Sequence, residues 1–228
     1  MILADAQDRL LLPLLLSLTA GYVDTAGFLA LQGLFTAHVT GNFVTLGASL
    51  VLGTSGALAK LLALPMFCAV IIAARLLGTW LANRGMPGFE VLLCVKILLL
   101  IVGAFLAIRF GPFPDGDNWL AISMGMALVA AMAVQNAFHR VHLSSVPPST
   151  LMTGTTTQIM LDIADRIYAR KGQARQPDSR LVNMSASVII FAIGCGAAAL
   201  AFLRFGVWCF AVPPALGALS LLARFMAR

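Results

Sequence analysis

Apolar residues fill long stretches of this chain, and short polar breaks separate them. A helix needs about 20 consecutive apolar residues to cross a bilayer. Five stretches meet this length, and a sixth does so despite a Pro-Pro pair: 10–33, 58–82, 88–110, 119–138, 181–203 and 206–226. The pattern predicts an all-α integral membrane protein with a single transmembrane domain over residues 1–228.

Two further apolar stretches are weaker. Residues 39–53 would form a helix of only about 22 Å, which is short of the ~30 Å hydrocarbon core. Residues 150–168 are long enough but contain Thr, Gln and Asp. Eight segments cross the membrane if both weak stretches span it, and six cross if both dip in and return. The short length of 39–53 favours six, whereas the length and charged end of 150–168 favour eight.

The order long, weak, long, long occurs twice along the chain. Gly41 aligns with Gly154 at an offset of 113, which places one weak stretch on the other. The sequence "VDTA" (23–26) matches "VQNA" (134–137) at an offset of 111. We therefore expect two internal repeats, about 10–110 and about 119–226, as in many transporters. Four crossings per repeat would make the copies parallel, and three crossings plus a re-entrant helix would make them inverted.

Polar residues recur at i, i+3 and i+7 in both weak stretches, which places them on one face of a helix. The stripe consists of Asn42, Thr45 and Ser49 in the first stretch, and of Thr155, Gln158 and Asp162 in the second. One interpretation is a lined pathway or binding site. The other is interhelical hydrogen bonding, which holds membrane helices together.

A Thr-Gly pair opens each weak stretch. A helix that begins there offers a capping hydroxyl, free backbone N–H groups and the positive end of its dipole. Two such starts that meet near the midplane would make one site for a small polar or anionic solute. The rival interpretation is that each glycine marks a close helix crossing. The predicted solute-binding residues are Thr40, Gly41, Asn42, Thr45, Thr153, Gly154, Thr155 and Gln158.

Asp24 lies within the first long apolar stretch. A carboxylate at mid-bilayer costs about 2.5–3.5 kcal/mol on insertion scales, so it needs a partner, a cavity or a proton. We expect Asp24 to be a coupling or gating group, with Gln135 and Asn136 at the matching place in the second repeat. Because Gln135 cannot titrate, any proton coupling would be asymmetric.

The alternative for Asp24 is a purely structural role. It would then pair with Arg75 or Lys96, which also lie in apolar stretches, or cap a helix break near Gly21. Gly21 and Gly27 flank the aspartate. They would allow either an unwound helix or tight helix packing.

Composition supports the membrane assignment. Hydrophobic residues make up 60% of the chain and charged residues 11%, which no soluble domain of this size could bury. The net charge of +6 does not indicate nucleic-acid binding, since five of the 15 Lys/Arg residues lie in one loop. By the positive-inside rule, that loop and both termini are predicted to be cytoplasmic. The loop cations are Arg166, Arg170, Lys171, Arg175 and Arg180.

No motif of an enzyme or a metal site stands out. The four cysteines form no CxxC pair, the three histidines lack HxxxH and HExxH spacing, and no GxSxG or phosphate-binding loop is present. We expect no cofactor, no metal and no catalytic residue. Two alternatives to a transporter or channel remain open. One is a scaffold or assembly protein without a solute path, and the other is a membrane enzyme that uses Asp24 and histidines.

The stretches "AGYVDTAGFLAL", "FTAHVTGNFVTLG" and "TLMTGTTTQIMLD" resemble the YoaK-like family of small bacterial polytopic membrane proteins. The resemblance covers essentially the whole chain. It implies a multi-pass protein of the bacterial inner membrane, with the lipid bilayer as a partner. It implies no substrate or reaction, and it leaves the solute, the use of protons and a homo-oligomeric state open.

Overall fold

The computed structural model describes residues 2–144, 146–150, 152–168 and 178–226, with the backbone alone described for residues 2–9. All regular structure within these residues is helical. The elements are α1 (Ile2–Ala30), η1 (Val39–Gly41), α2 (Asn42–Leu52), α3 (Ala57–Asn83), α4 (Gly88–Phe110), α5 (Trp119–His142), α6 (Met152–Tyr168), α7 (Asp178–Phe205), η2 (Gly206–Ala211) and α8 (Val212–Met226).

Helices long and apolar enough to cross a membrane cover most of the chain. The stretches are Leu10–Ala30, Ala57–Asn83, Gly88–Phe110, Trp119–His142 and Asp178–Met226. The last of them covers both α7 and α8. Large apolar side chains face outward, as on α7, where Leu203 is 85% exposed. Lipid, not water, suits such a surface, and the predicted all-α membrane protein is confirmed.

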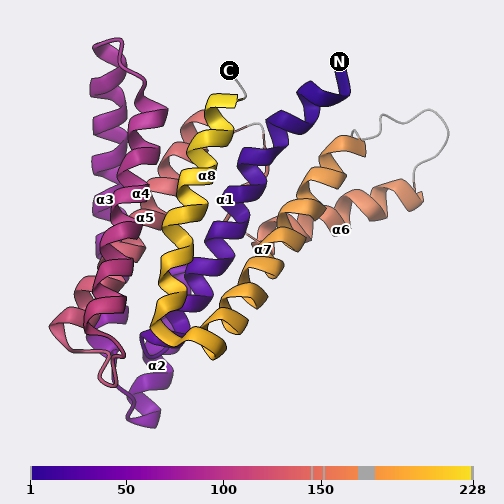
Figure 1. The fold of residues 1–228 in the computed structure, drawn as a ribbon. Coiled ribbons are helices and arrows are strands. Elements are labelled where there is room, and N and C mark those ends of the chain that lie inside the picture. The colour runs from indigo at the N-terminus through magenta and orange to yellow at the C-terminus, as the bar shows by residue number, and fades with distance from the viewer. Residues whose placement is uncertain (1, 145, 151, 169–177, 227–228) are drawn as a thin grey trace.

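Helices α1, α3, α4, α5, α7 and α8 alternate in direction along the bundle (Figure 1). Both termini and the α3–α4 connection lie at one end, and the α4–α5 connection lies at the other. Helices α2 and α6, which correspond to the two weak stretches, do not run the length of the bundle: α2 lies at the lower end in Figure 1, and α6 runs across the direction of its neighbours. Helices α1 and α5 therefore run in opposite directions, as do α3 and α7, and α4 and α8.

A polar connection closes the lower end of the bundle. Helix α2 ends at Leu52 and is capped by Gly53, whose φ of 66° lies in the left-handed region that favours glycine. The carboxylate of Asp117, from the α4–α5 connection, accepts hydrogen bonds from the N–H groups of Gly56 (3.0 Å) and Leu58 (2.9 Å). Asp117 thus satisfies two N–H groups at the start of α3 and ties the two connections together.

The long helices of each half of the chain pack mainly against helices of the other half. Helix α1 packs along α7 and α8, and α5 packs along α3 and α4, while α4 contacts α8. The first long helix of each half therefore buries its surface against the last two helices of the other half. Contact between α1 and α5 is slight by comparison.

Helices α1 and α7 approach each other at glycines. A Cβ on Gly21 would lie 2.2 Å from the carbonyl oxygen of Phe191, and a Cβ on Gly194 would lie 2.3 Å from that of Leu18. Such distances leave no room for a methyl group. Gly21 is thus a site of close helix packing within continuous α1, not a point where the helix unwinds.

Candidate functional site

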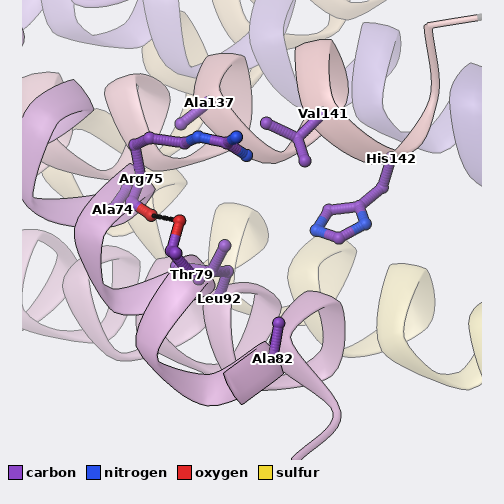
Figure 2. A pocket seen from close by; sticks show the side chains of 9 residues that line it. Ala74, Arg75, Thr79, Ala82, Leu92, Ala137, Val141 and His142 are labelled. Atoms are coloured by element: carbon purple, nitrogen blue, oxygen red, sulfur yellow. Dashed lines mark hydrogen bonds between the residues drawn. The ribbon is translucent and has the colours of Figure 1, made fainter.

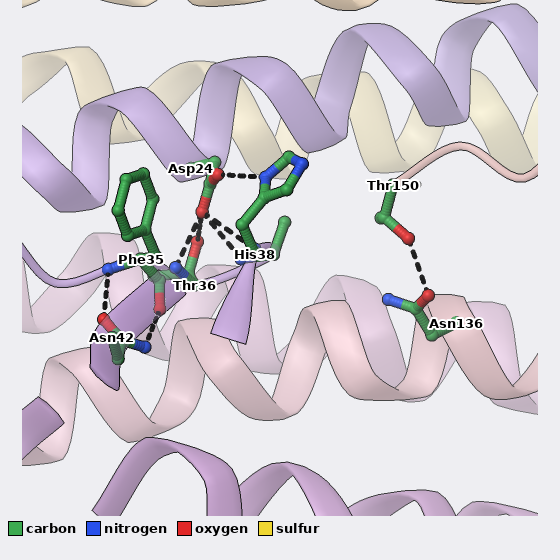
Figure 3. Close-up of polar contacts among 8 residues, drawn as sticks. Asp24, Phe35, Thr36, His38, Asn42, Asn136 and Thr150 are labelled. Atoms are coloured by element: carbon green, nitrogen blue, oxygen red, sulfur yellow. Dashed lines mark hydrogen bonds and ion pairs between the residues drawn. The ribbon is translucent and has the colours of Figure 1, made fainter. Parts of the chain in front are cut away.

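Asp24 binds the connection that follows its own helix (Figure 3). Its Oδ1 accepts the backbone N–H groups of Thr36 and Ala37, both at 2.7 Å, and its Oδ2 lies 2.7 Å from Nδ1 of His38. The His38 N–H and the Thr36 hydroxyl approach Oδ1 at 3.4 Å. Asp24 is buried, with 4% of its residue surface exposed. These contacts therefore supply the polar partners that a buried charge requires.

The expected cationic partners of Asp24 are not the observed ones. Neither Arg75 nor Lys96 is among its contacts, and Lys96 Nζ is buried without a hydrogen-bond partner in the described part of the chain. The histidines were predicted only as possible metal ligands or as partners of Asp24 in a membrane enzyme, and the pairing of His38 with Asp24 was missed. One indication of this pairing is present in the sequence: His38 follows Asp24 by 14 residues and lies in the polar break just before the weak stretch.

The side chain of Asn42 also binds the connection between α1 and η1. Its Oδ1 accepts the N–H of Phe35, and its Nδ2 donates to the carbonyl of Phe35, both at 2.8 Å (Figure 3). Gly41 donates its own N–H to the carbonyl of His38 at 2.8 Å. The expectation of a free N–H group at Gly41 is therefore wrong, because Asp24 and local turns already use the donors at this helix start.

The second half contains a comparable connection. Gln135, on α5, donates to the hydroxyl of Ser149 at 2.9 Å and to the carbonyl of Leu16 at 3.0 Å. Thr150 donates to Oδ1 of Asn136 at 2.7 Å (Figure 3). As with Asp24, polar side chains of a long helix reach the segment just before the next short helix. The second connection carries no charge at this point.

The polar stripes of α2 and α6 face the protein. Their buried members are Asn42, Ser49, Thr155 and Asp162. Lys60 Nζ, at the start of α3, donates to Ser49 at 2.6 Å. Likewise Arg180, at the start of α7, lies 3.8 Å from Asp162. In both halves, a cation on the following long helix thus meets the last polar residue of the stripe.

A pocket of about 490 Å³ adjoins the Asp24–His38 pair. It is mostly apolar with a few polar groups, which is the usual composition of a small-molecule site. Helix α7 forms one wall through Phe191 and Cys195. The remaining lining comes from α1 and the connection after it: Asp24, Thr25, Phe28, Leu29, Phe35, His38 and Gly41.

The second Thr-Gly turn lines another pocket, of about 340 Å³. Gly154, Thr155 and Gln158 of α6 face it, together with Arg180 and Met184 of α7. Gly41 and Gly154 therefore line two separate pockets, whereas the sequence pattern predicts one shared cavity. The two turns lie at different levels of α7, since Phe191 and Cys195 line the first pocket and Arg180 and Met184 line the second.

Four predicted residues fall outside both pocket linings. Thr40 and Thr153 are exposed, Asn42 is occupied by Phe35, and Thr45 donates to the carbonyl of Asn42 at 3.4 Å. Among the predicted binding residues, Gly41, Gly154, Thr155 and Gln158 reach a pocket. The α7 residues of both pockets were missed, since a pairing between distant helices leaves no local pattern.

The other two histidines lie away from His38. His139 and His142 are in the last turn of α5. No group of three or more metal-binding side chains occurs among the residues that the structure describes.

His38 makes the site sensitive to pH. Its hydrogen bond to Asp24 raises the pKa of the imidazole above its usual value near 6.5. A raised pKa in the folded protein means that protonated His38 stabilises the fold. This contribution is complete below about pH 6.5 and is lost as pH rises through the raised pKa.

We therefore expect wild-type protein to lose stability relative to His38→Gln as pH increases from 6 to 9. Thermal unfolding in detergent at a series of pH values measures the difference. His142→Gln is the control, since His142 has no contact with Asp24. A wild-type advantage that is constant over this range would contradict a stabilising charge on His38.

Comparison with known proteins agrees with this picture. The profile of the family "Protein of unknown function (DUF1275)" matches residues 12–223. A relative from Bacillus subtilis (strain 168), "UPF0700 transmembrane protein YoaK", is 32% identical over 203 residues, which cover 85% of each chain. No solved structure matches. The predicted resemblance is confirmed: the chain belongs to the DUF1275 family of YoaK-like multi-pass membrane proteins.

Proposed function

We propose that this protein is a small transporter or channel of the bacterial inner membrane, for a small polar or anionic solute. The observation that carries the proposal is the placement of both pockets on one face of α7. Arg180 and Met184 line one pocket, and Phe191 and Cys195 line the other. Spacings of four, seven and four residues keep all of them on the same side of the helix.

The gap between the two pockets is short. Met184 and Phe191 are seven residues apart, which is about 10 Å along a helix. Ser187 lies between them on the same face and is buried, at 2% exposure. A solute that leaves one pocket would reach the other by passing this serine, so a modest shift of α7 against α1 would open a path.

In this proposal the polar groups of the two pockets have different roles, solute binding in one pocket and gating in the other. In the Gly154 pocket the first turn of α6 presents the positive end of a helix dipole, which suits an anionic group, and Arg180 adds a cation that Asp162 partly balances at 3.8 Å. In the Gly41 pocket the N–H donors are bound by Asp24, so Asp24 acts there as a gating group. It positions the connection that carries His38, and protonation of His38 strengthens this contact while loss of the proton weakens it.

A duplicated, inverted architecture fits this function. Two copies of one unit are supported by the opposite helix directions and by the packing of each half against the other. The contacts are also equivalent: Gln135 in the second half takes the place of Asp24 in the first, and Asp162 takes the place of Ser49. Inverted repeats are common in transporters, where the two copies form alternating openings. In this proposal the ends of the bundle that hold both termini face the cytoplasm, in accord with the charge distribution.

Cysteine accessibility tests the path without knowledge of the solute. Ser187→Cys is made in a background in which all four native cysteines are replaced by alanine, and the protein is placed in liposomes. We expect a charged, water-soluble methanethiosulfonate to modify it, because a solute path must admit water. Ile189→Cys is the matched control, since Ile189 is on the same helix but 58% exposed toward lipid.

Failure of Ser187→Cys to react from either side would indicate a dry interior. That result would favour the scaffold interpretation and remove the main support for transport. If the path is wet, a thermal-shift panel of small anions, amines and metabolites identifies the solute class. Binding to the native state raises the melting temperature by mass action.

A further inference from the structure

A third pocket lies where α3, α4 and α5 meet (Figure 2). It has a volume of about 240 Å³. Its floor consists of small or apolar side chains and its polar groups are few: Ala74, Arg75, Gly78, Thr79, Ala82, Leu92, Ala137, Val141 and His142 line it. Neither Thr-Gly turn nor Asp24 contributes, so this pocket is separate from the proposed solute path.

Arg75 places a positive charge in this pocket. Its side chain extends from α3 toward Ala137 and Val141 on α5 (Figure 2). The guanidinium has no ion pair or hydrogen bond in the described part of the chain, although Thr79 donates its hydroxyl to the Arg75 carbonyl at 3.0 Å. Among the residues that the structure describes, no hydrogen bond accepts any of the five N–H donors of the Arg75 guanidinium.

The depth of Arg75 makes an unpaired charge costly. Helix α3 has 27 residues and is about 40 Å long, so it extends about 5 Å beyond each side of a ~30 Å hydrocarbon core. Arg75 precedes the end of α3 by eight residues, about 12 Å. In an α3 centred on this core, its Cα would lie about 7 Å inside the hydrocarbon, and only the tip of an extended side chain would reach the boundary.

The charges around the pocket are not balanced. Glu90 is paired with Arg224 at 3.1 Å, and both act electrostatically on His142, as Arg75 does, so two arginines share one carboxylate around this pocket. His142 faces Arg75 across the pocket and adds no negative charge (Figure 2). The occupant must therefore bring an anion to the membrane boundary and apolar groups to the small-residue floor.

We infer that this pocket binds an anionic phospholipid, with the lipid phosphate on Arg75 and an acyl chain along Ala74, Gly78 and Ala82. A phosphate oxygen suits the planar donors of a guanidinium, which bind it in pairs. Basic pockets between membrane helices bind anionic headgroups by this chemistry. A zwitterionic lipid brings a positive group beside its phosphate and fits less well.

The test is lipid binding by purified protein. Phosphatidylglycerol and phosphatidylcholine are titrated separately onto wild-type protein in detergent, and bound lipid is measured by native mass spectrometry and by the melting temperature. Wild-type protein is expected to prefer phosphatidylglycerol, and Arg75→Gln is expected to lose about tenfold in its affinity for that lipid. Arg84→Gln is the matched control. Arg84 is on the same side of the bundle, but stacks on Trp80 with 4.2 Å between the guanidinium carbon and the ring centre.

Three results would overturn the inference. Arg75→Gln would bind phosphatidylglycerol as wild type does, or Arg84→Gln would lose as much affinity as Arg75→Gln. In a third arm, inorganic phosphate at the same concentration would raise the melting temperature as much as the lipid, which would make the site one for a free anion. If Arg75→Gln proves unstable, Arg75→Lys serves instead, since it keeps the charge but loses the paired donors.

Discussion

Replacing Gly21 with alanine is expected to disrupt the fold more than any other single methyl group added to α1. The new Cβ would meet the Phe191 carbonyl oxygen at 2.2 Å. Backbone atoms cannot rotate away as a side chain can, so α1 and α7 must separate. Overpacking usually costs about 1–3 kcal/mol, and we expect a loss in the free energy of unfolding at or above the upper limit. Thermal unfolding and the yield of monodisperse protein in detergent measure it.

Glycines of α7 supply the controls for this prediction. Gly194→Ala should be as harmful as Gly21→Ala, because its Cβ would approach the Leu18 carbonyl oxygen at 2.3 Å. Gly196→Ala, two residues later, should be neutral or slightly stabilising, because nothing lies within 4 Å and alanine favours helix. Equal behaviour of Gly194→Ala and Gly196→Ala would show that α1 and α7 do not cross here.

Asp24→Ala is expected to cost about 3 kcal/mol or more of unfolding free energy. The N–H groups of Thr36 and Ala37 are buried and bond to Asp24. Each buried donor left without an acceptor costs about 1–3 kcal/mol. The loss is read from thermal unfolding in detergent, with Asp165→Ala as the control, since Asp165 is exposed on α6.

Asp24→Asn distinguishes the roles of the Asp24 carboxylate. Its amide oxygen still accepts from the connection, so the fold should be retained with a smaller loss of stability. Its amide nitrogen cannot stabilise a protonated His38, so the dependence of stability on pH between 6 and 9 should disappear. Wild-type stability in Asp24→Ala would contradict the structural role, and an unchanged pH dependence in Asp24→Asn would contradict the role of the Asp24–His38 pair.

The long helices were predictable because a span in lipid needs an unbroken apolar run, and such a run is visible in any sequence. The buried stripe of Asn42 and Ser49 was also predictable, because residues seven apart lie on one face of a helix. The partner of Asp24 did not follow, because it is mainly backbone N–H, which every residue carries. Residue spacing alone also favoured a free N–H at Gly41, since it does not reveal that His38 turns back to accept it.

The pairing of α1 with α7 was beyond prediction from local pattern. Apolar helices that face lipid and those that face each other carry the same kinds of residue, because packing in membranes depends on shape. The only local trace of the contact is glycine, at Gly21 and Gly194, and the chain has 20 glycines. The location of the pockets on α7 depends on this pairing, so it was equally hidden.

The packing of each half against the other sets an order of events during synthesis. Helix α1 enters the bilayer first, but its principal neighbour follows about 170 residues later. At about 5–20 residues per second, a ribosome needs roughly 10–35 seconds to supply it. During that interval α1 stands among lipids or beside the insertion machinery. Asp24 need not wait, because its partners in the connection to η1 are made within the next 14 residues, and the nascent chain can neutralise its most costly group before its helical partners exist.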